Sequence, residues 1–280
     1  MNPEQYASSI ISDLKIKSLP INPFDVARSL KITIHEVDAD SYDGLYLRVG
    51  NKFLININNN ISNTGRKHFT LAHELGHHFI PSHTNSAYQC SPNPFKSKGA
   101  IEKEADRFAS ELLLPEILLK PMLHTYKADF ESISELSEDC DTSLTATAIK
   151  FTQHTDDCCA LIATSNNIIK WFSKSSSFPY WIDYGAEISA GTLTASYSLK
   201  GVLQASESKE VHASYWVKGK GIDNSTTLIE SCVPMPEYGV VLTMLWFPNP
   251  PFDTSGYGDE DEEYRYESDP NTWRWRDKEE

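Results

Sequence analysis

Residues 73–77 form the sequence His-Glu-Leu-Gly-His, in which two histidines lie four residues apart and a glutamate follows the first. On a helix, residues four apart share a face, so His73 and His77 can both direct a ring nitrogen at one zinc ion. Glu74 is rotated by about 100° from His73 and points beside the metal. A carboxylate in that place can hold a water molecule and remove its proton. The spacing therefore predicts metal-assisted hydrolysis with Glu74 as the general base.

A catalytic zinc ion needs a third protein ligand and one open position for water. The segment GAIEKEADRFASELLLP, residues 99–115, offers Glu102, Glu104 and Asp106. Glu102 and Asp106 are four residues apart, so Glu102 can bind the metal while Asp106 accepts a hydrogen bond from a ligand histidine. Glu104 lies about 200° around the helix from Glu102. We predict Glu102 as the third ligand, with Glu104 as the alternative, and a solvated helix charge is the alternative for Asp106.

Four further side chains near this motif are weaker candidates for a functional role, namely His68, His78, His83 and Tyr88. A lone histidine is usually structural, so we expect His68 and His78 to be packing or surface residues. His83 lies in the segment after the motif, where it can contact either substrate or solvent. Tyr88 lies in the same segment and could donate a hydrogen bond to an oxyanion, but we expect it to face solvent.

Two amphipathic helices must position the candidate ligands. Residues 65–80 carry an apolar stripe that Pro81 ends, and residues 99–114 carry a second one that ends before Pro115. The intervening residues are rich in Pro, Ser and Asn, which is typical of a loop. A loop of this length is a candidate flap on the substrate side.

Upstream of the motif, the pattern predicts two helices and a hairpin. The helices cover residues 4–15 and a short segment from Asn22, the expected N-cap, through Leu30. Two runs of alternating apolar residues then flank a turn at residues 50–52, which predicts a hairpin. We expect one apolar face on it, formed by Leu45, Leu47, Val49, Phe53, Ile55 and Ile57.

The charge of the chain, its hydropathy and its cysteine content bear on whether it binds nucleic acid, contacts a membrane or forms disulfides. The 25 Lys and Arg residues and 39 Asp and Glu residues give a net charge of −14. Because so acidic a chain repels a phosphate backbone, we expect no direct binding of nucleic acid. No apolar run approaches the roughly 18 residues of a membrane helix, and the first twenty residues lack a signal-peptide pattern, so we expect a cytoplasmic protein without membrane contact. The five cysteines show no CxxC spacing, which predicts reduced thiols that bind no metal.

The motif segments GRKHFTLAHELGHHF and EKEADRFASELLLPEIL resemble the ImmA/IrrE family of zinc metallopeptidases. That family pairs a helix of the form FTLAHELGH with a later one of the form ExxAxxFAxxLLxP. The resemblance extends upstream to INPFDVARSLKI and covers roughly residues 5–120. It implies a gluzincin-like fold in which His73, His77 and Glu102 bind Zn²⁺ and Glu74 is the catalytic base.

Together these patterns predict an α+β protein. After the motif helices, residues 116–153 have a helical pattern, and beyond Asp157 β-branched and aromatic runs predict strands. We expect four parts, which are a zinc metallopeptidase domain of a small sheet and zinc-binding helices (1–125), a helical connector (126–155), a β-rich C-terminal domain (156–252) and an acidic tail (253–280).

Several members of the resembled family cleave a transcriptional repressor. The resemblance therefore implies a zinc endopeptidase that hydrolyses a peptide bond in a regulatory partner protein. The alternative is a non-catalytic, zinc-containing regulator that binds a partner protein without cleaving it.

Residues 131–153 weakly resemble a helix-turn-helix, but their acidic side chains would be repelled by the negative phosphates of nucleic acid. We expect that segment to pack or to contact protein.

Overall fold

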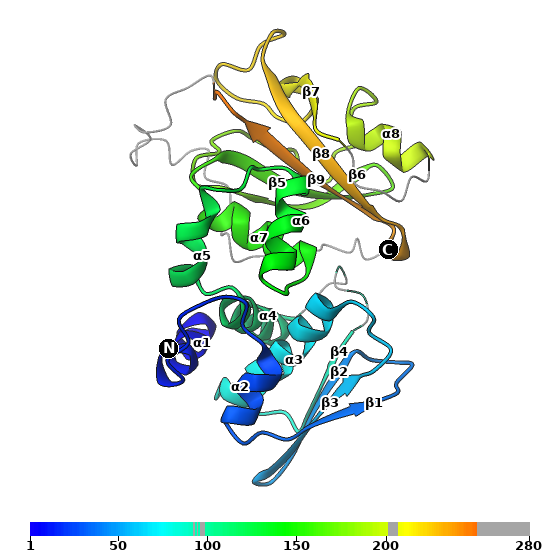
Figure 1. Cartoon of the computed structure of the whole chain (residues 1–280). Coiled ribbons are helices and arrows are strands. Elements are labelled where there is room, and N and C mark those ends of the chain that lie inside the picture. The colour runs from blue at the N-terminus through cyan, green and yellow to red at the C-terminus, as the bar shows by residue number, and fades with distance from the viewer. Residues whose placement is uncertain (92, 94, 96–98, 201–206, 251–280) are drawn as a thin grey trace. The chain divides into compact units, whose positions relative to one another are not determined.

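The computed structural model describes residues 1–91, 93, 95, 99–200 and 207–250 (Figure 1). The chain forms two compact units. The first combines Met1–Met122 with Ser134–Lys150, and the second combines Leu123–Ile133 with the described residues from Phe151 onward. The expected acidic tail lies outside the described residues, and the division into four parts stays a prediction.

Helices and two sheets alternate along the chain, so the α+β prediction is confirmed. The elements up to the second unit's sheet are α1 (Pro3–Asp13), α2 (Pro23–Ser29), β1 (Ile34–Val37), β2 (Gly44–Val49), β3 (Lys52–Asn58), α3 (Thr64–Phe79), β4 (Ala87–Cys90), α4 (Ala100–Leu113), α5 (Glu116–Leu123), α6 (Phe130–Asp139) and α7 (Leu144–His154). The helices expected around the motif and upstream of it are present with ends within two residues of those predicted. No helix in the described part of the chain is long and apolar enough to cross a membrane.

Local capping explains where these helices begin and end. The side chain of Asn22 accepts a hydrogen bond from the Phe24 amide, and Pro23 occupies the first position of α2, as expected. Asn63 caps α3 in the same way by accepting from the Arg66 amide at 2.8 Å. At the other end of α3, the Ile80 amide donates to the Gly76 carbonyl before Pro81 stops the helix. The helix that carries the motif is therefore delimited by its own sequence.

The sheet of the first unit has the strand order β1-β3-β2-β4, with β1 parallel to β3 and the other pairs antiparallel. In Figure 1, α3 lies beside this sheet, and α4 packs against α3. Gly76 makes this close crossing of the helices feasible, because a Cβ there would lie 3.2 Å from both the Cα of Ala105 and the ring of Phe108. The crossing brings the two motif helices together.

The hairpin of β2 and β3 is confirmed and Ile55 and Ile57 are buried as expected, but the apolar face expected on β2 is wrong. Val49 pairs with Lys52, so the turn holds only Gly50 and Asn51, one residue fewer than expected. Since a shift of one residue turns the side chains of a strand to the other face, Ile55 lies opposite Tyr46. The buried positions of β2 are therefore Gly44 and Tyr46, while Leu45, Leu47 and Val49 are partly or fully exposed.

The segment between the two motif helices is not loop throughout. Ala87–Cys90 forms β4, which pairs antiparallel with β2 so that Cys90 lies opposite Gly44 and Tyr88 opposite Tyr46. Tyr88 and Cys90 are buried and alternate with exposed Ala87 and Gln89. The Pro-, Ser- and Asn-rich composition of the segment concealed this short edge strand. Part of the expected flap, at residues 92, 94 and 96–98, lies outside the described chain.

The turn between α6 and α7 supports the start of the motif helix within the first unit. A Cβ at Gly65 would lie 2.6 Å or less from backbone atoms of Thr142 and Ser143, so α3 packs directly on this turn. The Nδ1 atom of His68 lies 3.0 Å from the Asp141 carbonyl oxygen. His68 is therefore a packing residue, as expected from the sequence.

The second unit contains the strands expected after Asp157, in a five-stranded antiparallel sheet of order β6-β5-β9-β8-β7. Its elements are β5 (Cys158–Ser165), β6 (Ile168–Lys174), α8 (Leu193–Lys200), β7 (Lys209–His212), β8 (Thr227–Met235) and β9 (Val240–Phe247). Among the residues beyond Asp157, where the sequence predicts strands, Ala213–Tyr215 instead forms a 3-10 turn. The buried Glu230 carboxylate on β8 caps α8 by accepting from the amides of Leu193 and Thr194.

Candidate metal centre

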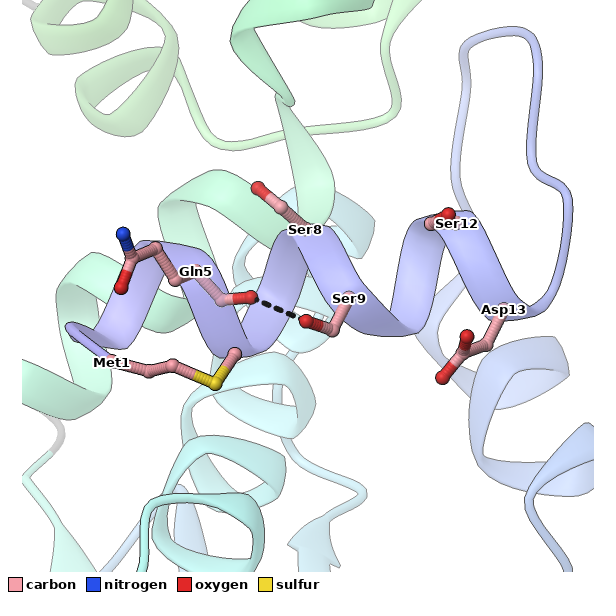
Figure 2. A pocket seen from close by; sticks show the side chains of 6 residues that line it. All are labelled: Met1, Gln5, Ser8, Ser9, Ser12 and Asp13. Atoms are coloured by element: carbon pink, nitrogen blue, oxygen red, sulfur yellow. Dashed lines mark hydrogen bonds between the residues drawn. The ribbon is translucent and has the colours of Figure 1, made fainter.

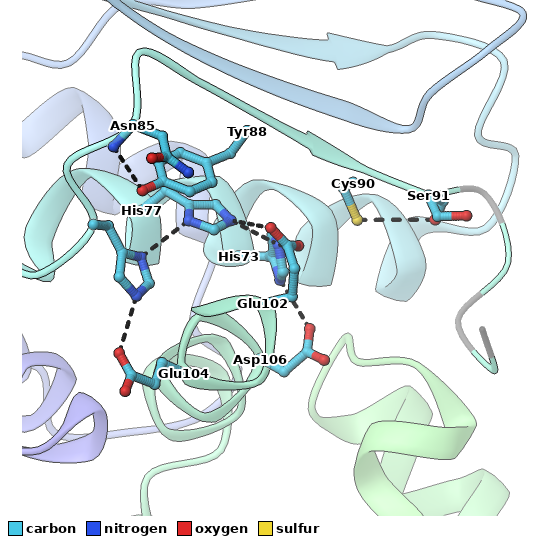
Figure 3. Close-up of polar contacts among 10 residues, drawn as sticks. His73, His77, Asn85, Tyr88, Cys90, Ser91, Glu102, Glu104 and Asp106 are labelled. Carbon is cyan, nitrogen blue, oxygen red and sulfur yellow. Dashed lines mark hydrogen bonds and ion pairs between the residues drawn. The ribbon is translucent and has the colours of Figure 1, made fainter. Parts of the chain in front are cut away.

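His73 and His77 from α3 and Glu102 from α4 converge (Figure 3). One donor atom from each lies within 4.8 Å of the other two. Glu102 places Oε2 3.0 Å from Nε2 of His73 and Oε1 3.4 Å from Nε2 of His77, and the two Nε2 atoms are 3.1 Å apart. The structure thus brings together all three ligands predicted from the sequence. We call these three residues the HHE set.

The HHE set fits a zinc ion by chemistry and by size. Two imidazole nitrogens and one carboxylate oxygen are a donor combination found in catalytic zinc sites. Bonds of about 2.0–2.1 Å in a tetrahedron separate neighbouring donors by about 3.3 Å. The two Nε2 atoms are 3.1 Å apart, and each has one of the two Glu102 carboxylate oxygens at 3.0 or 3.4 Å, which is close to that spacing. Three protein donors also leave a fourth position for water.

The protonation states of the HHE set suit metal binding. Burial is the largest effect on His77 and lowers the pKa of its ring to about 4. Burial alone would raise the pKa of the Glu102 carboxyl, but hydrogen bonds from His73 and His77 outweigh it and hold that pKa well below its ordinary value. At neutral pH the His77 ring is therefore uncharged and the Glu102 carboxylate is ionised. These are the forms that bind a divalent cation.

Each ligand histidine is held at its second ring nitrogen. Asp106 Oδ1 lies 2.8 Å from Nδ1 of His73, the contact expected from the spacing of α4. Nδ1 of His77 lies 3.0 Å from Nδ1 of His83, and Nε2 of His83 lies 3.1 Å from Oε2 of Glu104. When Nε2 of His77 binds a metal ion instead of hydrogen-bonding to Glu102, the ring proton lies on Nδ1 and is donated to His83, whose Nε2–H donates to Glu104. This chain of contacts fixes the ring orientation of His77.

Two residues, His83 and Tyr88, lie in surroundings that differ from those expected. His83 is fully buried behind His77, so it faces neither substrate nor solvent. Tyr88 is buried and stacks on the His77 ring at a centroid distance of 4.0 Å, so the expected solvent exposure is wrong. Glu104, the alternative ligand, contacts His83 and does not belong to the HHE set. The clearest signal for His83 in the sequence was its position just beyond the end of the motif helix.

Replacing His83 by Ala should weaken metal binding by about 10- to 100-fold, the usual cost of removing a group that orients a ligand histidine. The physical reason is that His77 loses the acceptor that fixes its tautomer and ring angle. Competition between the protein and a chelator for Zn²⁺ measures the change. The matched control is His35→Ala, because His35 is exposed on β1. Equal affinities in the two variants would contradict this role.

Glu74 is fully buried beside the HHE set, and Gly44 makes room for it. A Cβ at Gly44 would lie 2.7 Å from Cγ2 of Thr70, 2.9 Å from Cγ of Glu74 and closer still to its carboxylate. A carboxylate oxygen of Glu74 lies within 4.8 Å of a ring nitrogen of His73. Glu74 is thus adjacent to the ligands without being one of the HHE set.

Gly44→Ala should therefore push Glu74 out of place. A displacement of about 1 Å can cost about 100-fold in rate, so we expect a loss of that order in peptide hydrolysis with metal binding retained. Activity and metal content measured on the same preparation check this. Gly99→Ala is the matched control, because a Cβ there meets nothing within 4 Å among the described residues. Full activity in Gly44→Ala would refute the inference that the space at Gly44 keeps Glu74 in position.

A shallow hollow on α1 offers no comparable chemistry. Figure 2 shows it lined by one helix, where the Ser9 hydroxyl donates to the Gln5 carbonyl at 2.9 Å. Its lining residues are Met1, Gln5, Ser8, Ser9, Ser12 and Asp13. One carboxylate without a histidine or cysteine is not a catalytic set, so the candidate site is the HHE set.

Comparison with known proteins finds a family match over the part of the chain that contains α3 and α4. Residues 27–152 match the IrrE N-terminal-like domain family. Metallopeptidase ImmA of Bacillus subtilis (strain 168) is 32% identical over 106 residues, which cover 36% of this chain and 59% of ImmA. The match thus spans less than two thirds of that relative.

A solved structure named Mycobacterium tuberculosis transcriptional regulator superposes with a TM-score of 0.53 over 87% of each chain at 9% identity. At that identity the likeness concerns the fold alone, and it extends into both units. The family match covers α3 and α4, which carry the HHE set and Glu74. Residues 27–152 of this chain are therefore similar to the IrrE N-terminal-like domain, and part of the chain is similar to a metallopeptidase.

Proposed function

We propose that this protein is a zinc-dependent endopeptidase that hydrolyses a peptide bond in a regulatory partner protein, with a transcriptional repressor as the expected class of substrate, in the cytoplasm. The observation that carries the proposal is the convergence of the HHE set with the buried Glu74 carboxylate beside it. The substrate class rests on the family resemblance. The peptidase activity rests on the site as well.

Each side chain of the site has a separate role in the proposed hydrolysis. Zn²⁺ held by the HHE set would supply a Lewis acid that acidifies water and polarises the scissile carbonyl. Glu74 accepts the proton of the attacking water and delivers it to the departing amine nitrogen. Asp106 holds the ring of His73, and His83 with Glu104 holds the ring of His77. The single negative charge of Glu102 leaves part of the cation's charge to act on substrate.

The proposal is tested by co-expression with a candidate transcriptional regulator, and a regulator encoded beside this gene would be the first candidate. We expect defined fragments of that regulator with the wild-type enzyme, identified by mass spectrometry of the purified products. A regulator that co-purifies intact with the wild-type enzyme would instead support the non-catalytic alternative. Purified enzyme loaded with Zn²⁺ should reproduce the cleavage, which excludes a host protease as its source.

A further inference from the structure

Cys90 lies next to the candidate base. One donor atom from each of His73, Glu74 and Cys90 lies within 4.8 Å of the other two, and all three side chains are buried. We call these three residues the HEC set. It shares His73 with the HHE set, and its other two members come from α3 and from the edge strand β4.

The pairing of β4 with β2 independently directs Cys90 toward Glu74. Cys90 lies opposite Gly44, and residues directly opposite each other in an antiparallel pair project to the same face. The Cβ direction at Gly44 leads onto the Glu74 carboxylate. The thiol of Cys90 therefore emerges on the face that holds Glu74. The cysteine spacing in the sequence predicted no metal ligand, so only the fold assembles this set.

The donor chemistry of the HEC set differs from that of the HHE set. Nitrogen, carboxylate oxygen and thiolate sulfur together favour borderline and soft divalent cations such as Zn²⁺, Co²⁺ and Cd²⁺. A cation binds the sulfur as thiolate, so the thiol proton is released to solvent when the sulfur–metal bond forms.

We propose that the HEC set is a second binding site for a thiophilic divalent cation, overlapping the first at His73. A cation held there makes Glu74 a ligand, so its carboxylate no longer accepts the proton of the attacking water. Occupation of the HEC set therefore inhibits hydrolysis. This consequence for activity rests on the proposed peptidase function, whereas cation binding by the set does not.

Co²⁺ is a suitable probe, because a thiolate ligand gives it a near-ultraviolet sulfur-to-metal charge-transfer band. We expect this band when the metal-free full-length chain is titrated with Co²⁺. The band should be lost in Cys90→Ser and retained in the matched control Cys232→Ser, which alters a buried cysteine on β8 of the second unit. Absence of the band from the wild-type protein overturns the proposal, and this result needs no variant to fold.

Glu102→Gln separates the two sets, because Glu102 belongs only to the HHE set. We expect the charge-transfer band to persist in this variant. Its loss would show that sulfur reaches only an ion bound by the HHE set, which overturns a separate HEC set. Cleavage of the partner is measured without added Co²⁺, so loss of the proposed function and loss of the HEC set give different results.

Discussion

Replacing Glu74 by Gln is expected to lower the rate of partner cleavage by about 10²- to 10⁴-fold, the contribution typical of a general base. That factor corresponds to about 3–5 kcal/mol in the activation free energy. Glutamine has nearly the shape of glutamate, so it fills the space beside Gly44 and Thr70. Its amide, however, cannot accept the proton of the attacking water. Zn²⁺ bound by the HHE set should remain, because Glu74 is not one of its members.

Single-turnover cleavage and zinc content, measured on the same protein, separate these two effects. The matched control is Glu135→Gln, the same substitution at an exposed site on α6. We expect it to cleave at the wild-type rate. Wild-type cleavage by Glu74→Gln would remove Glu74 from the mechanism and leave the metal centre without its base.

The second large effect is expected from Glu102→Gln. The neutral amide removes the only negative charge of the HHE set and the oxygen pair that lies 3.0 and 3.4 Å from the two ligand histidines. We expect zinc affinity to fall by more than about 100-fold, beyond the usual cost of losing an orienting partner. Peptide hydrolysis should be lost with the metal.

Glu104→Gln, two residues away on the same helix, is the matched comparison for Glu102→Gln. Glu104 contacts His83 and reaches the metal ligands only through it. Its substitution should therefore weaken zinc binding by at most about 10- to 100-fold. The reverse order of effects, measured by chelator competition, would make Glu104 the third ligand and would refute the HHE set.

Local physics explains which features could be predicted from the sequence. The four-residue spacing of His73 and His77 places both rings on one face of any helix that contains them. Caps and prolines act within a turn of the chain, so the start of α2 at Asn22 and Pro23 and the stop of α3 at Pro81 followed from adjacent residues. The preference for Glu102 over Glu104 as the third metal ligand also came from helix geometry, and the structure places Glu102 with the histidines.

The sheet was predicted less well, because strand partners and register depend on distant residues. A turn shorter by one residue reversed the buried face of β2 and placed Tyr46 where Leu45 and Leu47 were expected. The edge strand β4 lies in a segment with the composition of a loop, and its hydrogen bonds to β2 come from residues about forty positions earlier. That pairing determines the burial of Tyr88.

The sequence by itself determined two imidazoles on one helical turn, a glutamate beside them and an acidic helix to complete the donors. Only the tertiary structure decided what surrounds them, including the contact of His77 with His83, the space that Gly44 leaves for Glu74 and the approach of Cys90. The physical reason is the separation along the sequence of the residues that interact. Helix spacing is set by bonds within a few residues, whereas these contacts depend on how α4 crosses α3 and how β4 pairs with β2.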